Sequence, residues 1–320
     1  MERKIIFRCR VGSHLYGLQR TESDEDYMSV FIPTSKDLLG LNPVNEVDNS
    51  TKSSSADRRN TAGDVDDKAY ALPKFMHLLL GNNPNIVEVL FATSDVVEVL
   101  EPEFQTLVDN YQKIVSQKVF HTFTGYAFSQ KKKLTVKSER YGSLVESVHD
   151  MERKFSTEEL HDTKRAITEE ESSYLNKTLK YYKGRDGNTE SFHKGMPLKT
   201  IYEKLVYERD NYGWRVKTDT FDQLGYDVKF GAHMIRIMIE GIYLLESGKL
   251  SFPFSGDDYN TLMRIRKGEI DLNQLYKIYD FYDSKIMSLK EKTELRKKPD
   301  FNWANDYLIR TLKNSIISET

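Results

Sequence analysis

The hydrophobic pattern changes along this chain, and that change limits the possible fold more than any other feature. Before residue 72, alternating apolar residues predict three short strands, at Lys4 to Arg10, Tyr27 to Ile32 and Val65 to Ala71. Leu72-Pro73 then opens an amphipathic helix, and beyond about residue 100 the period is helical. We therefore expect an α+β fold, with a mixed β-sheet flanked by helices and then a mostly helical domain.

Length and composition indicate more than one folded domain. The 320 residues exceed the usual size of a single domain. We expect a first domain at 1–105 and a helical domain at 106–320. The helical domain carries a polar and charged insertion at about 140–220, with a short β piece near Gly213 to Thr218. Residues 42–63 are rich in Ser, Asn, Thr and Asp, which predicts a loop.

Charge and cysteine content exclude several classes of protein. Hydrophobic residues make up 38% and charged residues 30% of the chain, which argues against global disorder. The net charge of -2 gives no basic field over the whole surface, although 47 Lys and Arg can still form a local basic groove. Cys9 is the only cysteine, so no disulfide framework exists, and we expect it in a buried strand.

The sequence predicts no contact with a membrane. The N-terminus lacks the long apolar core of a signal peptide, and no run reaches the roughly 18 apolar residues that span a bilayer. The most apolar stretch, Met234 to Leu245, contains Arg236 and Glu240, which is typical of a core helix. We expect a cytoplasmic protein, or one of the host cytoplasm if the chain is viral. The pattern does not indicate an oligomeric state.

The end of the first strand and the start of the second carry residues suited to phosphate and metal. Gly12-Ser13 follows the first strand, and Asp24-Glu25-Asp26 leads into the second. Because strand residues two apart share a face, Asp24 and Asp26 project together, and two such carboxylates suit Mg²⁺. Gly12 permits close approach of the backbone to a phosphate, which the Ser13 hydroxyl and nearby N–H groups can bind.

A third carboxylate is needed for chemistry with two metal ions. The third strand offers Asp66, with Asp64 on the same face as the alternative. An acidic turn before a strand would also explain the Asp24-Glu25-Asp26 segment. Gly12-Ser13 and a third acidic strand running directly into an amphipathic helix favour the metal site.

Two helical segments carry polar residues on one face. Lys229, His233, Arg236 and Glu240 are spaced by four, three and four residues, so a cationic stripe can face phosphates. A solvated face is the alternative, and Arg236 can equally pair with a structural carboxylate.

The second such face holds Tyr126, Gln130 and Lys133. It combines a ring for base stacking with amide and ammonium donors, which suits a nucleotide or single-stranded RNA. A basic solvated face is again the alternative. Asn83 and Asn85 are predicted to cap a helix.

These motifs resemble a known family. The segments Gly12-Ser13-His14-Leu15-Tyr16-Gly17 and Ser23-Asp24-Glu25-Asp26 are similar to the active-site signature of predicted nucleotidyltransferases of the DNA polymerase β superfamily, in the subgroup named for association with RNA ligases. Further similarities are Asp66 six residues before Leu72, Tyr70-x-Leu72-x-Lys74-Phe75, Asn83-Pro84-Asn85 with Glu88 to Phe91, Gly125-Tyr126-Ala127 with Gln130 and Lys133, and Tyr226-Asp227-x-Lys229 with His233 and Arg236. The resemblance spans roughly residues 8–91, 120–135 and 225–250.

The resemblance implies a set of site residues. Asp24, Asp26 and Asp66 would bind two divalent cations, Mg²⁺ or Mn²⁺. Here Asp67-Lys68 follows Asp66 where the family often has a hydrophobic residue, so the third acid stays open among Asp64, Asp66 and Asp67. The residues implied to bind the nucleotide are Gly12, Ser13, Ser23, Tyr126, Gln130, Lys133, Lys229 and His233.

The implied activity is transfer of a nucleoside monophosphate from a nucleoside triphosphate to a hydroxyl acceptor, with an RNA or tRNA end as one such acceptor. Two alternatives remain. One is the same chemistry on a protein side chain, which would transfer AMP. The other is a nucleotide- or RNA-binding module without catalysis. The three acids argue against this alternative, because a protein that only binds a triphosphate gains nothing from carboxylates that repel it.

Overall fold

The computed structural model describes residues 3–20, 23–51, 65–179, 191–216 and 224–319, with the backbone alone at 133, 135–141, 211–216 and 318–319. Two compact units are present. The first comprises Met1–Phe128, Ala232–Ile265 and Tyr276–Thr320, and the second comprises Ser129–Gly231 and Arg266–Leu275. The expected domain boundary at residue 105 stays a prediction.

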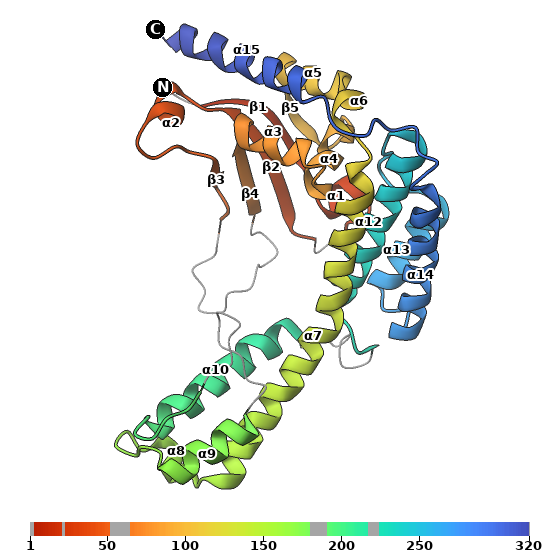
Figure 1. The fold of residues 1–320 in the computed structure, drawn as a ribbon. Coiled ribbons are helices and arrows are strands. Elements are labelled where there is room, and N and C mark those ends of the chain that lie inside the picture. The colour runs from red at the N-terminus through yellow and green to blue at the C-terminus, as the bar shows by residue number, and fades with distance from the viewer. Residues whose placement is uncertain (1–2, 21–22, 52–64, 180–190, 217–223, 320) are drawn as a thin grey trace. The chain divides into compact units, whose positions relative to one another are not determined.

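A five-stranded mixed sheet forms the centre of the first unit (Figure 1). Its strands are β1 (Lys4–Arg10), β2 (Glu25–Ile32), β3 (Glu46–Asp48), β4 (Val65–Ala71) and β5 (Val97–Leu100). Their order is β3-β4-β2-β1-β5, with β2 and β4 parallel and the other neighbours antiparallel. The expected α+β class and the three expected strands are confirmed.

The sequence analysis did not predict two of the strands, β3 and β5. β3 lies within the segment expected to be a loop, so that expectation is wrong for Glu46–Asp48. β3 is short and polar, and it forms by pairing with β4 at the edge of the sheet rather than through its own periodicity. β5 has four residues and pairs with β1 at the opposite edge.

Helices cover one face of this sheet. α3 packs against β2 and β4, and α5 packs against β1, where the Phe7 and Phe104 rings stack with centroids 3.9 Å apart. Pro73 lies in the first turn of α3, and Phe75 and Leu79 on its inner face are fully buried. The helices of this region are α1 (Ser13–Tyr16), α2 (Ser35–Leu39), α3 (Leu72–Leu80), α4 (Pro84–Val87), the 3₁₀ helix η1 (Glu88–Phe91), α5 (Pro102–Asp109) and α6 (Tyr111–Ile114).

Long helices complete the chain. Four of them, α7, α12, α13 and α14, have residues in both units. Gly248 directly follows α12 in a left-handed conformation (φ 74°). Their bounds are α7 (Lys118–Lys154), α12 (Val228–Ser247), α13 (Gly256–Arg266), α14 (Leu272–Leu289) and α15 (Phe301–Glu319). α15 packs against α3 within the first unit.

The second unit buries a core of its own, although its sequence is polar. α8 (Thr157–His161), α9 (Glu169–Thr178) and α10 (Leu198–Val216) accompany the later part of α7. The buried side chains are Leu144, Val148, Met151, Phe155, Leu160, Ile167, Leu175, Leu179, Phe192, Leu198, Ile201 and Leu205. The β piece expected near Gly213 to Thr218 is wrong up to Val216, because those residues continue α10, and the remainder lies outside the described residues.

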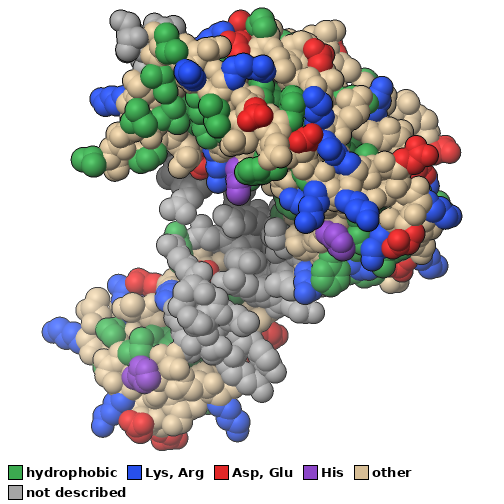
Figure 2. All heavy atoms as spheres, turned by 45° about the horizontal axis from the view of Figure 1, so that its top comes forward, with side chains coloured by type: hydrophobic (Ala, Val, Ile, Leu, Met, Phe, Trp, Pro, Cys, Tyr) green, Lys and Arg blue, Asp and Glu red, His purple; other side chains and the backbone are tan. Residues whose placement is uncertain are grey.

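Charged side chains of both signs lie on the surface of the described residues. On the face drawn in Figure 2, basic and acidic side chains are interspersed, in keeping with the net charge of -2. Among the described residues, no helix combines the length and apolarity needed to cross a bilayer.

Candidate active site

Two of the predicted acids are neighbours at one edge of the sheet. This edge is where β1 ends and β2 and β4 begin, and Asp26 is the paired residue of Asp66 in the parallel ladder. Paired residues of parallel strands point to the same face, so the two carboxylates lie side by side. Like charges in such positions repel unless something positive lies near them.

The Gly12-Ser13 turn lies directly against this pair. Val11 N–H donates to the Asp26 carbonyl oxygen over 2.8 Å, and Gly12 follows with φ 64°. A Cβ at Gly12 would lie 2.8 Å from Asp26 Oδ2, so the site accepts only glycine without rearrangement. Ser13 begins α1, a single helical turn that continues to Tyr16.

The structure separates the candidates for the third acid. Asp66 lies on the same face as Asp26 and accepts a hydrogen bond from Ser50 Oγ over 2.9 Å. Asp67 points to the opposite face, where its Oδ2 lies 2.7 Å from Arg8 Nη1 in a partly buried ion pair. Asp64 lies outside the described residues. The geometry therefore favours Asp66 and assigns Asp67 a structural contact.

Asp24 stands apart from the ladder. It lies one residue before β2 begins, so strand pairing does not fix its position. Among the described residues, no three His, Cys, Asp or Glu side chains gather closely enough to hold a metal ion. The donor set nevertheless fits a hard divalent cation, because Asp26 and Asp66 are paired oxygen donors, with Gly12 leaving space beside them.

Ser23 has a local structural contact. Arg20 N–H donates to Ser23 Oγ over 2.8 Å, and Ser23 N–H donates to the Arg20 carbonyl oxygen over 3.0 Å. The serine therefore closes a turn just before the acids. A nucleotide contact of Ser23 stays a prediction.

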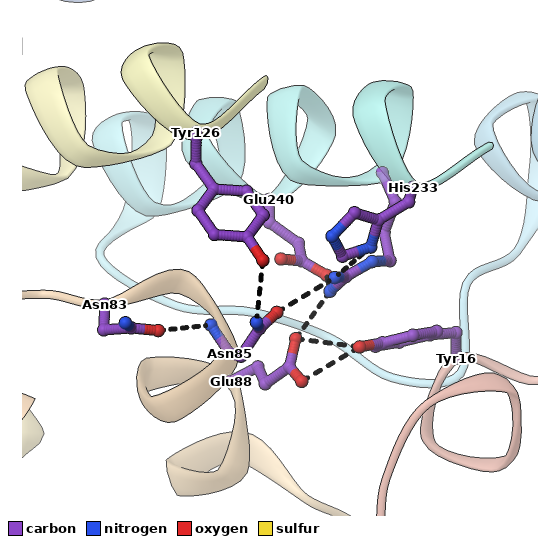
Figure 3. A network of polar contacts seen from close by, with 8 residues as sticks. Tyr16, Asn83, Asn85, Glu88, Tyr126, His233 and Glu240 are labelled. Carbon is purple, nitrogen blue, oxygen red and sulfur yellow. Dashed lines mark hydrogen bonds and ion pairs between the residues drawn. The ribbon is translucent and has the colours of Figure 1, made fainter. Parts of the chain in front are cut away.

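The predicted nucleotide-binding residues on the helices divide between the two units. Tyr126 and His233 come together in the first unit, with their rings edge to face and centroids 5.6 Å apart (Figure 3). Gln130, Lys133 and Lys229 belong to the second unit. Gln130 is 3% exposed, Lys229 is exposed at the start of α12, and the Lys133 side chain lies outside the described residues.

A buried polar network lies beneath Tyr126 and His233. Arg236 Nη1 donates to Glu88 Oε2 over 2.5 Å and to Glu240 Oε1 over 2.6 Å. The Tyr16 hydroxyl donates to both Glu88 oxygens, at 2.9 and 3.0 Å. Arg236 also lies over the Tyr16 ring, 4.2 Å from its centroid. This network joins α1, η1 and α12 around one guanidinium.

Burial sets the charges of this network. It raises the pKa of the Glu240 carboxyl to about 8, although the Arg236 charge acts in the opposite direction. Burial lowers the pKa of Arg236, but Glu240, Tyr16 and Glu88 outweigh it, and the pKa lies above its ordinary value. Burial also raises the pKa of Tyr16 well above its usual range.

The network corrects one reading of the sequence. Arg236 is 2% exposed and pairs with Glu88 and Glu240, so it does not form part of a solvent-facing cationic stripe. The alternative expectation, that it pairs with structural carboxylates, is confirmed. The sequence analysis included Tyr16 and Glu88 only as parts of segments that resemble the family, and it assigned neither residue a role. A Glu within an apolar segment needs a buried partner, which was the physical signal for Glu88.

Asn83 and Asn85 have different roles. Asn83 caps α4, since its Oδ1 accepts a hydrogen bond from the Asn85 N–H over 3.1 Å, as expected. The Asn85 side chain instead belongs to the network. Its Oδ1 accepts from Arg236 Nη2 over 3.3 Å, and its Nδ2 donates to the Tyr126 hydroxyl over 3.3 Å.

Comparison with known proteins gives the family. The sequence model of the RNA repair pathway DNA polymerase beta family matches residues 1–310. The chain belongs to this family. Membership confirms the resemblance drawn from the Gly12-Ser13 and Asp24-Glu25-Asp26 segments. The matched residues belong to both compact units.

A relative in a virus was also found. The chain is 27% identical over 143 residues to a protein of Enterobacteria phage T4 named "Uncharacterized 38.9 kDa protein in nrdC-mobD intergenic region". The match covers 44% of this chain and 42% of the phage protein, so it spans less than half of each. No solved structure matches the chain.

Proposed function

We propose that this protein is a metal-dependent nucleotidyltransferase that transfers a nucleoside monophosphate from a nucleoside triphosphate to a hydroxyl group of RNA. The observation that carries the proposal is the pairing of Asp26 with Asp66 on one face of the sheet, against the backbone of Gly12. Family membership supports the reaction class, and the RNA repair pathway in the family's description supports an RNA or tRNA end as the acceptor.

The reaction requires one bond to form and one to break. The acceptor oxygen bonds to the α-phosphorus, the bond from that phosphorus to the bridging oxygen breaks, and pyrophosphate leaves with that oxygen. The acceptor proton passes to solvent. Two divalent cations, Mg²⁺ or Mn²⁺, would lower the pKa of the acceptor hydroxyl and stabilise the charge on the departing pyrophosphate.

The aspartates would divide the work of holding these ions. Asp24 and Asp26 would contact both, and Asp66 only the one near the acceptor hydroxyl. Ser50 orients Asp66 through its hydroxyl, which leaves the carboxylate with a second oxygen for a ligand.

The turn and the helices would hold the nucleotide. Gly12 and Ser13 would bind the triphosphate through backbone N–H groups and the serine hydroxyl. Tyr126 and His233, which are partly buried rings in contact, would bind the nucleoside. Ser23, Gln130, Lys133 and Lys229 are proposed nucleotide contacts on the sequence resemblance alone.

The test follows the label from triphosphate to acceptor. Wild-type protein is incubated with Mg²⁺ or Mn²⁺, total RNA and protein lysate, and each α-labelled nucleoside triphosphate in turn, and we expect labelled RNA. Asp26→Asn should lower the rate by at least about a thousandfold, because it removes a carboxylate shared by both ions. Label found only in protein would overturn the RNA acceptor, and full activity of Asp26→Asn would overturn the site.

Glu25→Gln is the matched control. Glu25 lies between the two acids but is exposed on the opposite face, where it accepts a hydrogen bond from the Tyr27 hydroxyl over 3.0 Å. Glutamine keeps that acceptor, so activity and stability should match the wild type. Equal losses in Glu25→Gln and Asp26→Asn would point to a general charge effect instead of metal binding.

A further inference from the structure

Arg236 uses both terminal nitrogens of its guanidinium group, while its buried Nε has no hydrogen-bond partner among the described residues. The two terminal nitrogens carry four N–H groups, and four acceptors surround them. Nη1 donates to the two carboxylates, and Nη2 donates to Asn85 Oδ1 over 3.3 Å and contacts His233 Nδ1 at 2.9 Å. The side chain is 3% exposed, so solvent does not compete for these contacts.

The contact with His233 fixes the proton on that ring. A guanidinium has donors but no acceptor, so Nδ1 must accept and therefore carries no proton. A second cation on the imidazole would also meet the Arg236 charge at hydrogen-bond distance. This contact therefore favours the neutral tautomer of His233 with its proton on Nε2, the ring nitrogen that can then donate a hydrogen bond.

The contact with Asn85 fixes a second ring. Because Asn85 Oδ1 accepts from Arg236, its Nδ2 must face the other way, where it donates to the Tyr126 hydroxyl over 3.3 Å. Tyr126 then meets the His233 ring edge to face, at an interplanar angle of 72°. Figure 3 shows both rings above the carboxylates of Glu88 and Glu240. One guanidinium therefore orients both rings.

The third connection reaches the turn beside the acids. Glu88 accepts from Arg236 and from the Tyr16 hydroxyl, and the glutamate and the tyrosine are both buried. Tyr16 is the last residue of the helical turn that Ser13 begins. The backbone holds the same turn from another side, because Phe254 N–H donates to the Tyr16 carbonyl oxygen over 3.1 Å.

We propose that Arg236 is a positioning residue of the nucleotidyltransferase site. Through Glu88 and Tyr16 it fixes the Gly12-Ser13 turn that would hold the triphosphate, and through its other nitrogen it holds His233 and Tyr126 in the orientation that would receive the nucleoside. The proposal rests on the proposed function. It adds that His233 contacts the nucleotide as a neutral donor and not as a cation that neutralises phosphate.

Nitrogen NMR of the histidine rings tests the tautomer without any turnover. Two-bond ¹H–¹⁵N spectra of labelled wild-type protein, with the His233 signals assigned through His233→Gln, should show the Nε2–H pattern at neutral pH. In Arg236→Lys a single ammonium replaces the planar fork and cannot meet acceptors on both sides, so the pattern should become a mixture of tautomers. A protonated Nδ1 in the wild type would overturn the proposal.

Tyr16→Phe tests the connection to the turn, because it removes one hydroxyl and keeps the ring. With ATP, GTP, CTP and UTP, each with Mg²⁺, we expect KM for the preferred triphosphate to rise about tenfold, as for the loss of one hydrogen bond to a charged group, with kcat changed less. The matched control is Tyr282→Phe, which removes a hydroxyl that donates to Asp258 over 2.9 Å in the same unit. The control should leave KM unchanged.

The outcomes separate this proposal from the proposed function. Equal KM values for Tyr16→Phe and Tyr282→Phe would show that the hydroxyl serves stability alone, and the positioning role would be lost. If wild-type protein transfers no nucleotide at all, the proposed function fails. The histidine spectra, and calorimetric dissociation constants for the four Mg²⁺-bound triphosphates measured for the wild type and both variants, then still decide the positioning role.

Discussion

At the scale of single residues, the site depends on where each carboxylate points. Asp66 and Asp67 are adjacent in sequence, but the strand places one beside Asp26 and the other against Arg8 on the opposite face. The Arg8 guanidinium also donates to Ser29 and Glu98, so it joins strands across the sheet. One acid is therefore available for ligand chemistry, and its neighbour stabilises the sheet beneath it.

Gly12→Ala tests the close approach of the turn to Asp26. The positive φ of 64° and the 2.8 Å approach to Asp26 Oδ2 should both oppose a Cβ there. We expect a loss of about 1–2 kcal/mol in unfolding free energy, and about a hundredfold loss in kcat/KM if the reacting groups move by an ångström.

Chemical denaturation and steady-state kinetics provide these two measurements. Gly142→Ala is the control, because a Cβ at this helical position meets nothing within 4 Å, and it should stabilise α7 by about 0.5–1 kcal/mol. Wild-type kinetics in Gly12→Ala would show that the turn does not constrain the site.

Glu240 gives a prediction about pH. Two buried carboxylates share one guanidinium, and burial raises the pKa of Glu240 from 4.5 to about 8. The folded state therefore holds a proton that the unfolded state releases, and stability falls as pH rises from about 5 through 8. In Glu240→Gln this fall should be smaller, as measured by urea denaturation across that range. Parallel curves for the two proteins would contradict the assignment.

At the scale of elements, strands with a strong apolar periodicity could be predicted from the sequence, whereas strands that form only by pairing with a neighbour could not. β1 and β4 have the bounds expected from their apolar pattern, since a half-buried strand imposes that pattern on its residues. β3 and β5 depend on hydrogen bonds to a neighbour that is remote in sequence, so their own residues carry little signal. Residues 213–216 show the opposite case, because their local pattern predicted a strand but they form the end of the long helix α10.

The candidate site was predictable to a similar degree. Spacing and the turn residues pointed to Asp26, Asp66 and Gly12, whose proximity follows from two strands and one turn. The Tyr16, Glu88 and Arg236 network was not predictable, because its members come from three elements that meet only in the packed unit. Sequence spacing shows which residues share an element, but not which elements meet.

At the scale of the whole molecule, the two units have separate interiors. The second unit buries its own apolar cluster, in which Met151 is fully buried. The described residues of the polar insertion at about 140–220 therefore fold around an interior of their own. The matching of residues 1–310 by the family model shows that this insertion belongs to the family's architecture.

Met151→Ala tests the independence of the two interiors. It should destabilise the second unit by about 2–5 kcal/mol through the lost contacts and the cavity left behind. Hydrogen exchange followed by mass spectrometry should then show faster exchange in α8, α9 and α10 and unchanged exchange in the strands of the first unit. Faster exchange of equal size in both units would show that they unfold together.

The parallel pairing of β2 with β4 has a consequence for folding during synthesis on the ribosome. The two aspartates are synthesised far apart, and they become neighbours only after the intervening chain has folded back and the later strand has docked. Their mutual repulsion opposes that docking, so millimolar Mg²⁺ should accelerate the final closure of the sheet. A nascent chain therefore lacks the paired carboxylates until its tertiary structure is complete.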